Sequence, residues 1–394
     1  MPATPLPKFL LLYGALFAAF GVASPFLPGL LQQRGLNPAE IGGVLAAGTA
    51  IRLLAGPAGC RLADRLSLRR RTLAILTAAA AVVATFYLLP GGFWMLLVVG
   101  LLHASTLAPI VPLADTLSLG AASGRFEYGW VRGAGSAAFI LGATSAGQAI
   151  AGFGLVSIIW LNAGLLAAAV LAVAAVPDAV SAPATARQPP NARALLLLPG
   201  FVRLMIVAAL IQGSHAMHDS FAVLRWRDAG IGPGAAGLLW SEAVLAEVLV
   251  FIVLGPPLLR RIGPGGAMML AAAAGVVRWS VTAVTAWLPA VILVQPLHGL
   301  TFALLHLACM RLLAGMVPPN LAATAQAAYG TVAVGAMTAL LTLVSGDLYG
   351  RFGATAFLAM AVLCGAALPF AWSMAQTPPA RGLAQAGQQP SGDR

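Results

Sequence analysis

Ionisable and aromatic side chains interrupt several long apolar stretches of this sequence, and they are the residues that could do chemistry. A charge at the centre of a membrane-spanning helix costs about 2.5–3.5 kcal/mol on insertion scales, so it requires a partner or a water-filled cavity. In the first half of the chain the charged candidates are Arg52, Asp115 and Arg132. The second half contains more candidates, namely Gln212, His215, His218, Asp219, Trp240, Glu242, Glu247, Arg278, Trp279, His298 and His306.

Acids, an arginine and histidines in neighbouring apolar stretches could carry a proton. The proton affinity of a carboxylate depends on burial and on nearby cations, and histidine titrates near neutral pH. We therefore predict a proton-coupling group in the second half, made of Glu242, Glu247, Arg278, His298 and His306. Glu242 and Glu247 are five residues apart and point about 140° apart on a helix. The sequence leaves open which of the two glutamates pairs with Arg278.

A second set of polar and aromatic residues is predicted to bind a substrate. Asp115 and Arg132 lie at similar depth on neighbouring apolar stretches, so they could form an ion pair that is either structural or part of the site. An anionic substrate would favour an arginine as its partner, but the intramembrane acids slightly outnumber the arginines, so an anion is not required. The predicted substrate-binding residues are Arg52, Asp115, Arg132, Gln212, His215, Trp240 and Trp279.

A hydrolase and a metal site are the alternative interpretations of the seventh apolar stretch. Ser214 and His215 are adjacent, so on one helix they point about 100° apart, which is poor geometry for a nucleophile and its base. His215, His218 and Asp219 could bind a metal ion, but no cysteine lies with them. We expect neither an enzyme nor a metal site. A receptor or a channel is a further alternative, which the duplicated halves described below disfavour.

Lysine usage and net charge exclude two classes of partner. The chain contains one lysine, Lys8, and so lacks the lysine of a Walker A nucleotide-binding loop. The net charge of +11 is typical of basic loops retained on the cytoplasmic side of a membrane, and we do not interpret it as nucleic-acid binding. The cysteines, Cys60, Cys309 and Cys364, form no disulfide framework and no metal-ligand spacing. We expect no cofactor.

The elements that must position these residues are membrane-spanning helices. Of the 394 residues 60% are hydrophobic and only 8% are charged, whereas an ordinary soluble domain has about 25% charged residues. Apolar stretches of about 20 residues are long enough to cross the hydrocarbon core as helices. Twelve such segments are predicted, at 9–31, 39–61, 72–89, 93–119, 128–151, 155–176, 201–224, 234–257, 266–287, 290–314, 321–345 and 354–374.

The distribution of basic residues predicts the orientation of these helices. Fifteen Lys and Arg residues lie at the termini or in the connections after even-numbered segments, and four lie on the opposite side. This bias predicts that both termini and the central connection are cytoplasmic. The central connection, 177–200, is rich in proline and is predicted to be a linker, and the tail, 375–394, is predicted to be disordered.

The linker divides the chain into halves that resemble each other, 1–176 and 201–374. Gly35–Gly42 in the first outer connection matches Gly230–Gly237 at an offset of 195 residues, and further matches follow in order at offsets of 196 to 201. Two parallel six-helix repeats with a midplane binding site between them are typical of secondary transporters. We therefore predict an all-α membrane protein of twelve helices in two pseudo-symmetric bundles, acting as a monomer.

The sequence resembles the major facilitator superfamily in the connection after the second segment. Asp64-Arg65, followed by three arginines, resembles the signature of that superfamily, with Cys60 and Ser67 at positions where glycine is usual. More specifically, the chain is similar to the phenylpropionate permease family, which is itself similar to the lactose permease group. The stretches that carry this likeness are 128–136, 212–215, 240–247, 275–279 and 295–299.

The resemblance implies proton symport by alternating access. It implies that Asp64 and Arg65 latch the cytoplasmic gate, and that an acid on the fourth helix and an arginine on the fifth, here Asp115 and Arg132, bind substrate. An acid on the eighth helix, an arginine on the ninth and a histidine on the tenth would couple protons, matching Glu247, Arg278 and His298. The tenth segment lacks the family's acid, and Thr301 lies where that acid would be sought.

These observations together predict a secondary transporter of a small organic solute in a bacterial inner membrane. An aromatic carboxylate is one candidate substrate, with protons as the coupling ion. A sugar or nucleoside permease and a drug exporter of the same fold are the alternatives.

Overall fold

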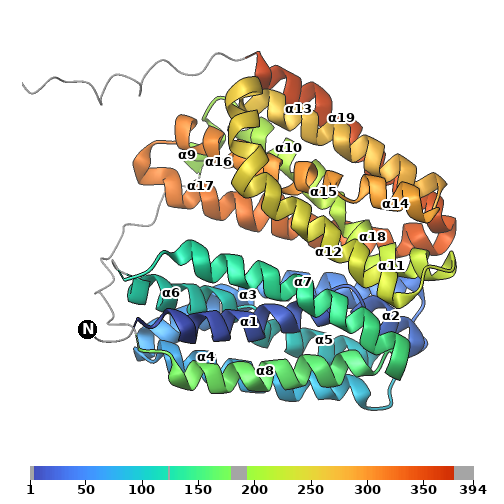
Figure 1. Ribbon diagram of the computed structural model, residues 1–394. Helices are drawn as coiled ribbons and strands as arrows, with labels where there is room; N and C mark the ends of the chain where they lie inside the picture. The colour runs from blue at the N-terminus through green and yellow to red at the C-terminus, as the bar shows by residue number, and fades with distance from the viewer. Residues whose placement is uncertain (1–3, 123–124, 179–192, 377–394) are drawn as a thin grey trace, which may run out of the picture.

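The computed structural model describes residues 4–122, 125–178 and 193–376, which are almost entirely helical and contain no strand. The first half forms one bundle of helices (Figure 1). Its elements are α1 (Leu6–Ala23), α2 (Leu27–Gln33), α3 (Pro38–Leu66), α4 (Arg69–Thr85), η1 (Phe86–Leu88), α5 (Phe93–Leu107), α6 (Ile110–Ala122), α7 (Tyr128–Phe153) and α8 (Ser157–Ala175).

The second half forms a similar bundle, in which several helices contain short π-helical stretches. Its elements are α9 (Arg193–Leu196), α10 (Phe201–Gly213), α11 (His215–Asp228), α12 (Pro233–Leu249), η2 (Val250–Leu254), α13 (Gly255–Val284), α14 (Leu288–Val294), α15 (Leu297–Gly299), η3 (Leu300–Leu304), α16 (Leu305–Met316), η4 (Pro319–Leu321), α17 (Ala322–Ala328), η5 (Tyr329–Ala336), α18 (Met337–Phe352), η6 (Gly353–Ala356) and α19 (Phe357–Ala375).

The helices account for the twelve predicted segments. Nine stretches of the described chain are long and apolar enough to span a bilayer, and two of them, of 52 and 57 residues, are about twice the length that one crossing needs. Each long stretch bends at a glycine with positive φ, Gly263 (69°) in the first and Gly353 (55°) in the second. Dividing them there, and adding the pair α10 and α11, gives the twelve spans of the predicted fold.

The first, fourth, seventh and tenth spans are broken helices rather than the continuous helices that the hydropathy pattern predicts. The first span is divided between α1 and α2, and Pro25 lies in the break. The seventh span is divided between α10 and α11 at Ser214, whose hydroxyl donates to the carbonyl of Ile211 at 2.6 Å. The break at Ser214 matters for function because His215 and His218 follow it directly.

The two bundles meet at one end of the molecule and diverge toward the other (Figure 1). They touch where α7 packs on α12, α3 on α18 and α2 on α11. The diverging end carries α6, α9 and the N-terminal end of α1 (Figure 1).

The closed end is built from two equivalent glycine contacts. A Cβ atom added at Gly346 on α18 would lie 2.7 Å from the carbonyl oxygen of Pro38 on α3. A Cβ added at Gly147 on α7 would likewise clash with the carbonyl oxygen of Pro233 on α12. Pro38 and Pro233 match in the internal repeat, at the offset of 195 residues. Because these contacts are with backbone, only glycine lets the bundles approach so closely.

Three sequence predictions concern the connections. Ser67, at a position where glycine is usual in the superfamily signature, ends α3 in the left-handed conformation with φ of 53°. Residues 193–196 of the predicted linker form the short helix α9. Residues 179–192 of that linker and 377–394 of the predicted disordered tail, with Arg187, Arg381 and Arg394, lie outside the described residues.

Candidate functional site

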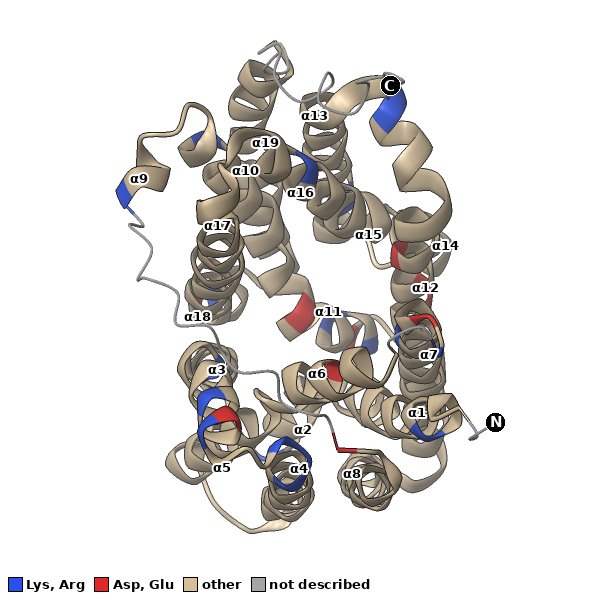
Figure 2. Ribbon diagram, turned by 90° about the vertical axis from the view of Figure 1, so that its left-hand side faces the viewer, with Lys and Arg blue, Asp and Glu red and all other residues tan. Residues whose placement is uncertain are grey.

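A cavity of about 640 Å³ lies between the two bundles. Its walls come from α1, α2, α3, α5 to α8 and η1 of the first bundle, and from α11, α12, α15 and α18 of the second. Of the predicted site residues, Arg52, Trp240, Glu247 and His298 line this cavity, and so does Asp219. Viewed from the diverging end, acidic segments of α6 and α11 lie toward the centre of the molecule (Figure 2).

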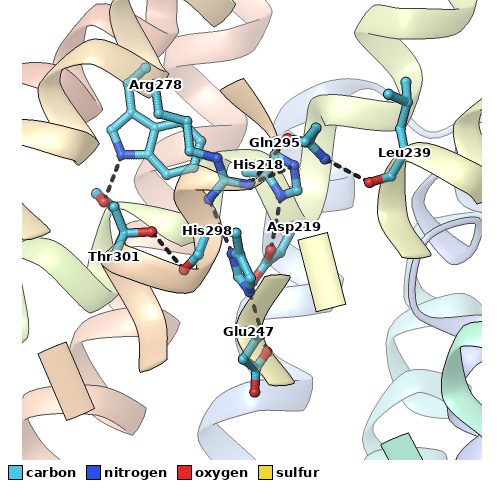
Figure 3. Close-up of polar contacts among 10 residues, drawn as sticks. His218, Asp219, Leu239, Glu247, Arg278, Gln295, His298 and Thr301 are labelled. Atoms are coloured by element: carbon cyan, nitrogen blue, oxygen red, sulfur yellow. Dashed lines mark hydrogen bonds and ion pairs between the residues drawn. The ribbon is translucent and has the colours of Figure 1, made fainter. Parts of the chain in front are cut away.

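Arg278 is the centre of a buried polar network in the second bundle (Figure 3). Its side chain lies on α13, has no exposed surface, and is held by three partners. One terminal nitrogen, Nη1, donates to Nδ1 of His298 at 3.1 Å. The other, Nη2, contacts Nε2 of His218 at 3.3 Å and Oε1 of Gln295 at 3.2 Å. The Gln295 amide is fixed in turn, because its nitrogen donates to the carbonyl of Leu239 at 3.1 Å.

The contacts with Arg278 determine which ring nitrogen of His298 and of His218 carries the hydrogen. A guanidinium group can only donate hydrogen bonds, so the nitrogens of His298 and His218 that face Arg278 must accept. A neutral imidazole then carries its hydrogen on the opposite nitrogen. That nitrogen of His298, Nε2, lies 3.5 Å from Oε2 of Glu247, and that of His218, Nδ1, lies 3.3 Å from Oδ1 of Asp219.

Arg278 is therefore linked to two carboxylates through two imidazoles (Figure 3). Neither acid contacts the guanidinium within 4 Å in the described chain. Both acids line the cavity, whereas Arg278 lies behind the histidines. A change in the charge of either carboxylate can thus affect the buried Arg278 through a single histidine.

Two predicted substrate residues, Trp279 and His215, lie behind this wall and do not line the cavity. Trp279 is fully buried, and its Nε1 donates to the hydroxyl of Ser214 at 2.9 Å. His215 packs edge-on between Trp279 and His298, with ring centroids 5.5 and 5.0 Å away. These contacts hold the broken seventh span against α13, which is a supporting role. They also use the hydroxyl that a hydrolase would need as its nucleophile.

The remaining second-half candidates form no hydrogen bond or ion pair with the network in the described chain, although His306 lies close enough to Glu247 for their charges to interact. His306 contacts the hydroxyl of Tyr329 through Nδ1 at 3.3 Å and is not part of the cavity wall. Gln212 is buried on α10, also away from the cavity. Glu242 lies on another face of α12 from Glu247, and it forms no ion pair with any residue that the structure describes. The structure thus brings one of the two glutamates to the site.

The first bundle contains the ion pair that the sequence allows. Nη1 of Arg132 on α7 lies 3.7 Å from Oδ1 of Asp115 on α6, and the Tyr13 hydroxyl donates to the same oxygen. The guanidinium lies 5.2 Å above the ring of Phe17. Both charged side chains are partly exposed, at 45% and 28%, and neither lines the cavity.

The two predicted gate residues lie in the last turn of α3, just before the connection to α4. Asp64 accepts a hydrogen bond from Nε of Arg69 at 2.7 Å, so its partner comes from the same bundle. Arg65 is exposed and has no hydrogen-bond or ion-pair partner among the residues that the structure describes. Their role as a latch between the bundles stays a prediction.

Three residues of the network were not in the predicted site, namely His218, Asp219 and Gln295. The sequence places His218 and Asp219 near the outer end of the seventh segment, where water could surround them. The structure instead places Asp219 in the cavity wall and His218 behind it against Arg278, where His218 packs on Trp240 with ring centroids 5.0 Å apart. The signal that could have found Gln295 is its amide group, polar and three residues before His298.

Comparison with known proteins identifies the family. Residues 6–359 match the MFS_1 like family. The chain is 33% identical over 360 residues, covering 89% of this chain and 93% of the relative, to a protein of Escherichia coli (strain K12) described as "Probable 3-phenylpropionic acid transporter".

Solved structures show the same fold. A crystal structure of the nucleoside transporter NupG matches with a TM-score of 0.81 at 18% identity, over 94% of this chain and 98% of that one. The human organic anion transporter MFSD10 matches with a TM-score of 0.60 at 18% identity, over 93% and 98%. The chain is a multi-pass membrane transporter rather than an enzyme, and it belongs to the MFS_1 like family of the major facilitator superfamily.

Proposed function

We propose that this transporter carries a small monocarboxylate with an aromatic or aliphatic body, together with protons, by alternating access. The observation that carries the proposal is the chain of contacts from Arg278 through His298 to Glu247, which ends at the cavity between the bundles. An ionisable group buried at such a place is costly, and it is kept where a solute and its coupling ion bind.

Size, lining and relationship support the substrate class. A cavity of about 640 Å³ accommodates a small organic molecule, and its lining combines apolar side chains with polar and charged ones. A relative with 33% identity is named as a probable transporter of 3-phenylpropionic acid, an aromatic monocarboxylate. Nucleosides and sugars remain the alternatives from the same fold, and a substrate screen distinguishes them.

Glu247 is the proposed proton carrier. Its carboxylate faces the cavity and the first bundle, and its contact with His298 of the same bundle is long, at 3.5 Å, so a small movement of α12 against α15 would make or break it. The proton affinity of a carboxylate changes when its hydrogen-bond donors and nearby cations change. Rocking of the bundles would therefore load a proton at Glu247 in one state and release it in the other.

Asp115 and Arg132 are proposed to act at the mouth of the path rather than in the cavity. They come from α6 and α7, whose ends lie on the diverging side of the molecule (Figure 1). The bias of basic residues supports a cytoplasmic location for that side and for both termini. The described state would then be open to the cytoplasm, with Asp64 and Arg65 available to close that side in the opposite state.

The test is substrate flux in proteoliposomes with an imposed pH gradient. We expect Glu247→Gln to exchange labelled 3-phenylpropionate across the membrane while losing its accumulation against a gradient. Glu242→Gln is the matched control, because Glu242 is on the same helix and outside the cavity wall. Normal accumulation by Glu247→Gln would contradict the assignment of Glu247, and wild-type flux of uridine or a sugar but of no carboxylate would contradict the substrate class.

A further inference from the structure

One wall of the cavity carries a cation that no acid neutralises. Arg52, on α3, lines the cavity and forms no hydrogen bond or ion pair within the described part of the chain. The two other intramembrane arginines are already occupied. Arg132 is paired with Asp115, and Arg278 is held by the three hydrogen bonds of the buried network. An unpaired charge inside a membrane protein requires a ligand or water, so Arg52 is the arginine available to a substrate.

Two further hydrogen-bond donors lie beside Arg52 in the same wall. His103 on α5 and Tyr87 in η1 both line the cavity, and their rings meet edge-on with centroids 5.8 Å apart. His103 is only 7% exposed, and its Nε2 has no partner in the described chain. A buried nitrogen without a partner costs about 1–3 kcal/mol, a cost that a bound acceptor would remove.

The wall leaves room for a ligand in front of these donors. Gly48 on α3 and Gly100 on α5 line the same part of the cavity. A Cβ atom added at Gly100 would lie 3.6 Å from the Tyr87 hydroxyl and 3.0 Å from Cγ1 of Val44. A side chain at this position would therefore fill the space beside the hydroxyl.

We propose that Arg52, His103 and Tyr87 form the carboxylate subsite of the cavity, which rests on the transport function proposed above. A guanidinium, an imidazole N–H and a phenol hydroxyl can together satisfy the two oxygens of one carboxylate. The single positive charge of Arg52 matches the single negative charge of a monocarboxylate. A second carboxylate on the ligand would face Asp219 and Glu247 across the cavity, so the subsite selects monocarboxylates over dicarboxylates.

The rest of the wall suits an apolar ligand body. Besides the subsite and the acids of the second bundle, the cavity is lined by the aromatic or aliphatic side chains of Phe20, Leu45, Leu107, Val111, Phe139 and Val244. The substrate carboxylate would thus bind to the first bundle, whereas the proton carrier, Glu247, belongs to the second. A bound substrate then contacts both halves and leaves Glu247 free to be protonated.

The test compares an acid with its neutral analogue. Binding of 3-phenylpropionate and of 3-phenylpropionamide to the full chain in detergent is measured by calorimetry. We expect wild type to prefer the acid, and Arg52→Gln to weaken acid binding by about 10- to 100-fold while changing amide binding little, because the lost contact is charge-assisted. Arg52→Lys should retain part of the preference, and Arg351→Gln, an exposed residue at the end of α18, should retain all of it.

The donors beside Arg52 give independent variants. His103→Phe and Tyr87→Phe should each weaken acid binding by about 3- to 10-fold, the effect of one hydrogen bond. If Arg52→Gln does not fold, these two variants and Arg52→Lys decide the question. Unchanged acid preference in all of them would overturn the subsite and leave the proposed function standing. Failure of wild type to bind or transport either 3-phenylpropionate or benzoate would instead contradict the proposed substrate class, and the subsite with it.

Discussion

The two halves of the molecule share a backbone plan but differ in their polar interiors. At the closed end, Gly346 meets the backbone of Pro38, and Gly147 meets that of Pro233, in equivalent contacts. In the interior of the described chain, by contrast, the first bundle has the partly exposed pair of Asp115 and Arg132 and the unpaired Arg52, while the second has a fully buried arginine bonded to two histidines. The two bundles therefore share the glycine contacts through which they close on each other. They differ in the polar side chains that we propose to bind substrate and protons.

The difference in burial suggests a division of work. A buried network is costly to disturb, because removing one member leaves the others without partners. Arg278 has no exposed surface, whereas the side chain of Arg132 is 45% exposed. We expect the second bundle to respond to substitution with loss of coupling, and the first with changes in substrate affinity.

The largest effect is expected at Arg278. Arg278→Gln leaves His298, His218 and Gln295 without their common donor, so proton-driven uptake should fall by more than about 100-fold, the sum of several charge-assisted hydrogen bonds. Uptake of labelled 3-phenylpropionate in proteoliposomes checks this, with melting temperature in detergent as the control for folding. Uptake within a few fold of wild type would remove the network from the mechanism.

Substitution of the glycines at the closed end should affect both halves alike. Gly346→Ala and Gly147→Ala each place a methyl group against a backbone carbonyl, so the bundles cannot close at this end. We expect each variant to lower transport by about 10-fold or more, because closing to the described state would cost on the order of 1–3 kcal/mol of strain. Accessibility of a cysteine introduced at Thr49, in the cavity wall, to an impermeant thiol reagent added outside should rise.

The control for the glycine variants is Gly164→Ala, since a Cβ at Gly164 meets nothing within 4 Å. A strong effect of one glycine variant with none of the other would show that the two contacts are not equivalent. The two halves would then differ in their backbone contacts at the closed end as well as in their polar interiors.

A moderate effect is expected for the first-half ion pair. Asp115→Asn should raise KM by less than about 10-fold and leave proton-driven accumulation intact, because partly exposed pairs contribute about 1 kcal/mol or less. The measurement is the KM for 3-phenylpropionate uptake beside the accumulation ratio. Tyr13→Phe removes the neutral donor to the same carboxylate and should have a smaller effect. Loss of accumulation in Asp115→Asn would place coupling in both halves.

The smallest effect is expected at Ser67. This residue adopts φ of 53°, a conformation in which a non-glycine residue is strained by about 1 kcal/mol. Ser67→Gly should therefore raise the melting temperature by a few degrees at most and leave transport unchanged. A lower melting temperature would show that the Ser67 side chain stabilises the connection in a way that outweighs the strain.

Much of the fold could be predicted from the sequence because bilayer thickness and backbone hydrogen bonding constrain it strongly. The twelve segments, the two bundles and the pairing of Asp115 with Arg132 follow from hydropathy and from charge at similar depth. The breaks in the first, fourth, seventh and tenth spans do not follow, because hydropathy averages over the residues at which a helix is interrupted.

The site was harder to predict because burial decides it. Sequence spacing places Glu247 and Glu242 on different faces of one helix but does not show which face meets the cavity. It cannot show that His298 lies between Glu247 and Arg278, since that depends on how α12, α13 and α15 pack. His103 is a lone histidine in an apolar segment of the sequence, and its unpartnered nitrogen is visible only in three dimensions.

Proton movement driven by substrate tests the central claim most directly. When 3-phenylpropionate is added outside wild-type proteoliposomes without a pH gradient, we expect the external medium to become alkaline as protons enter with the substrate. Glu247→Gln should still take up the labelled substrate under exchange conditions but give no alkalinisation, and Glu242→Gln should behave like wild type. Alkalinisation of normal size in Glu247→Gln would contradict the account.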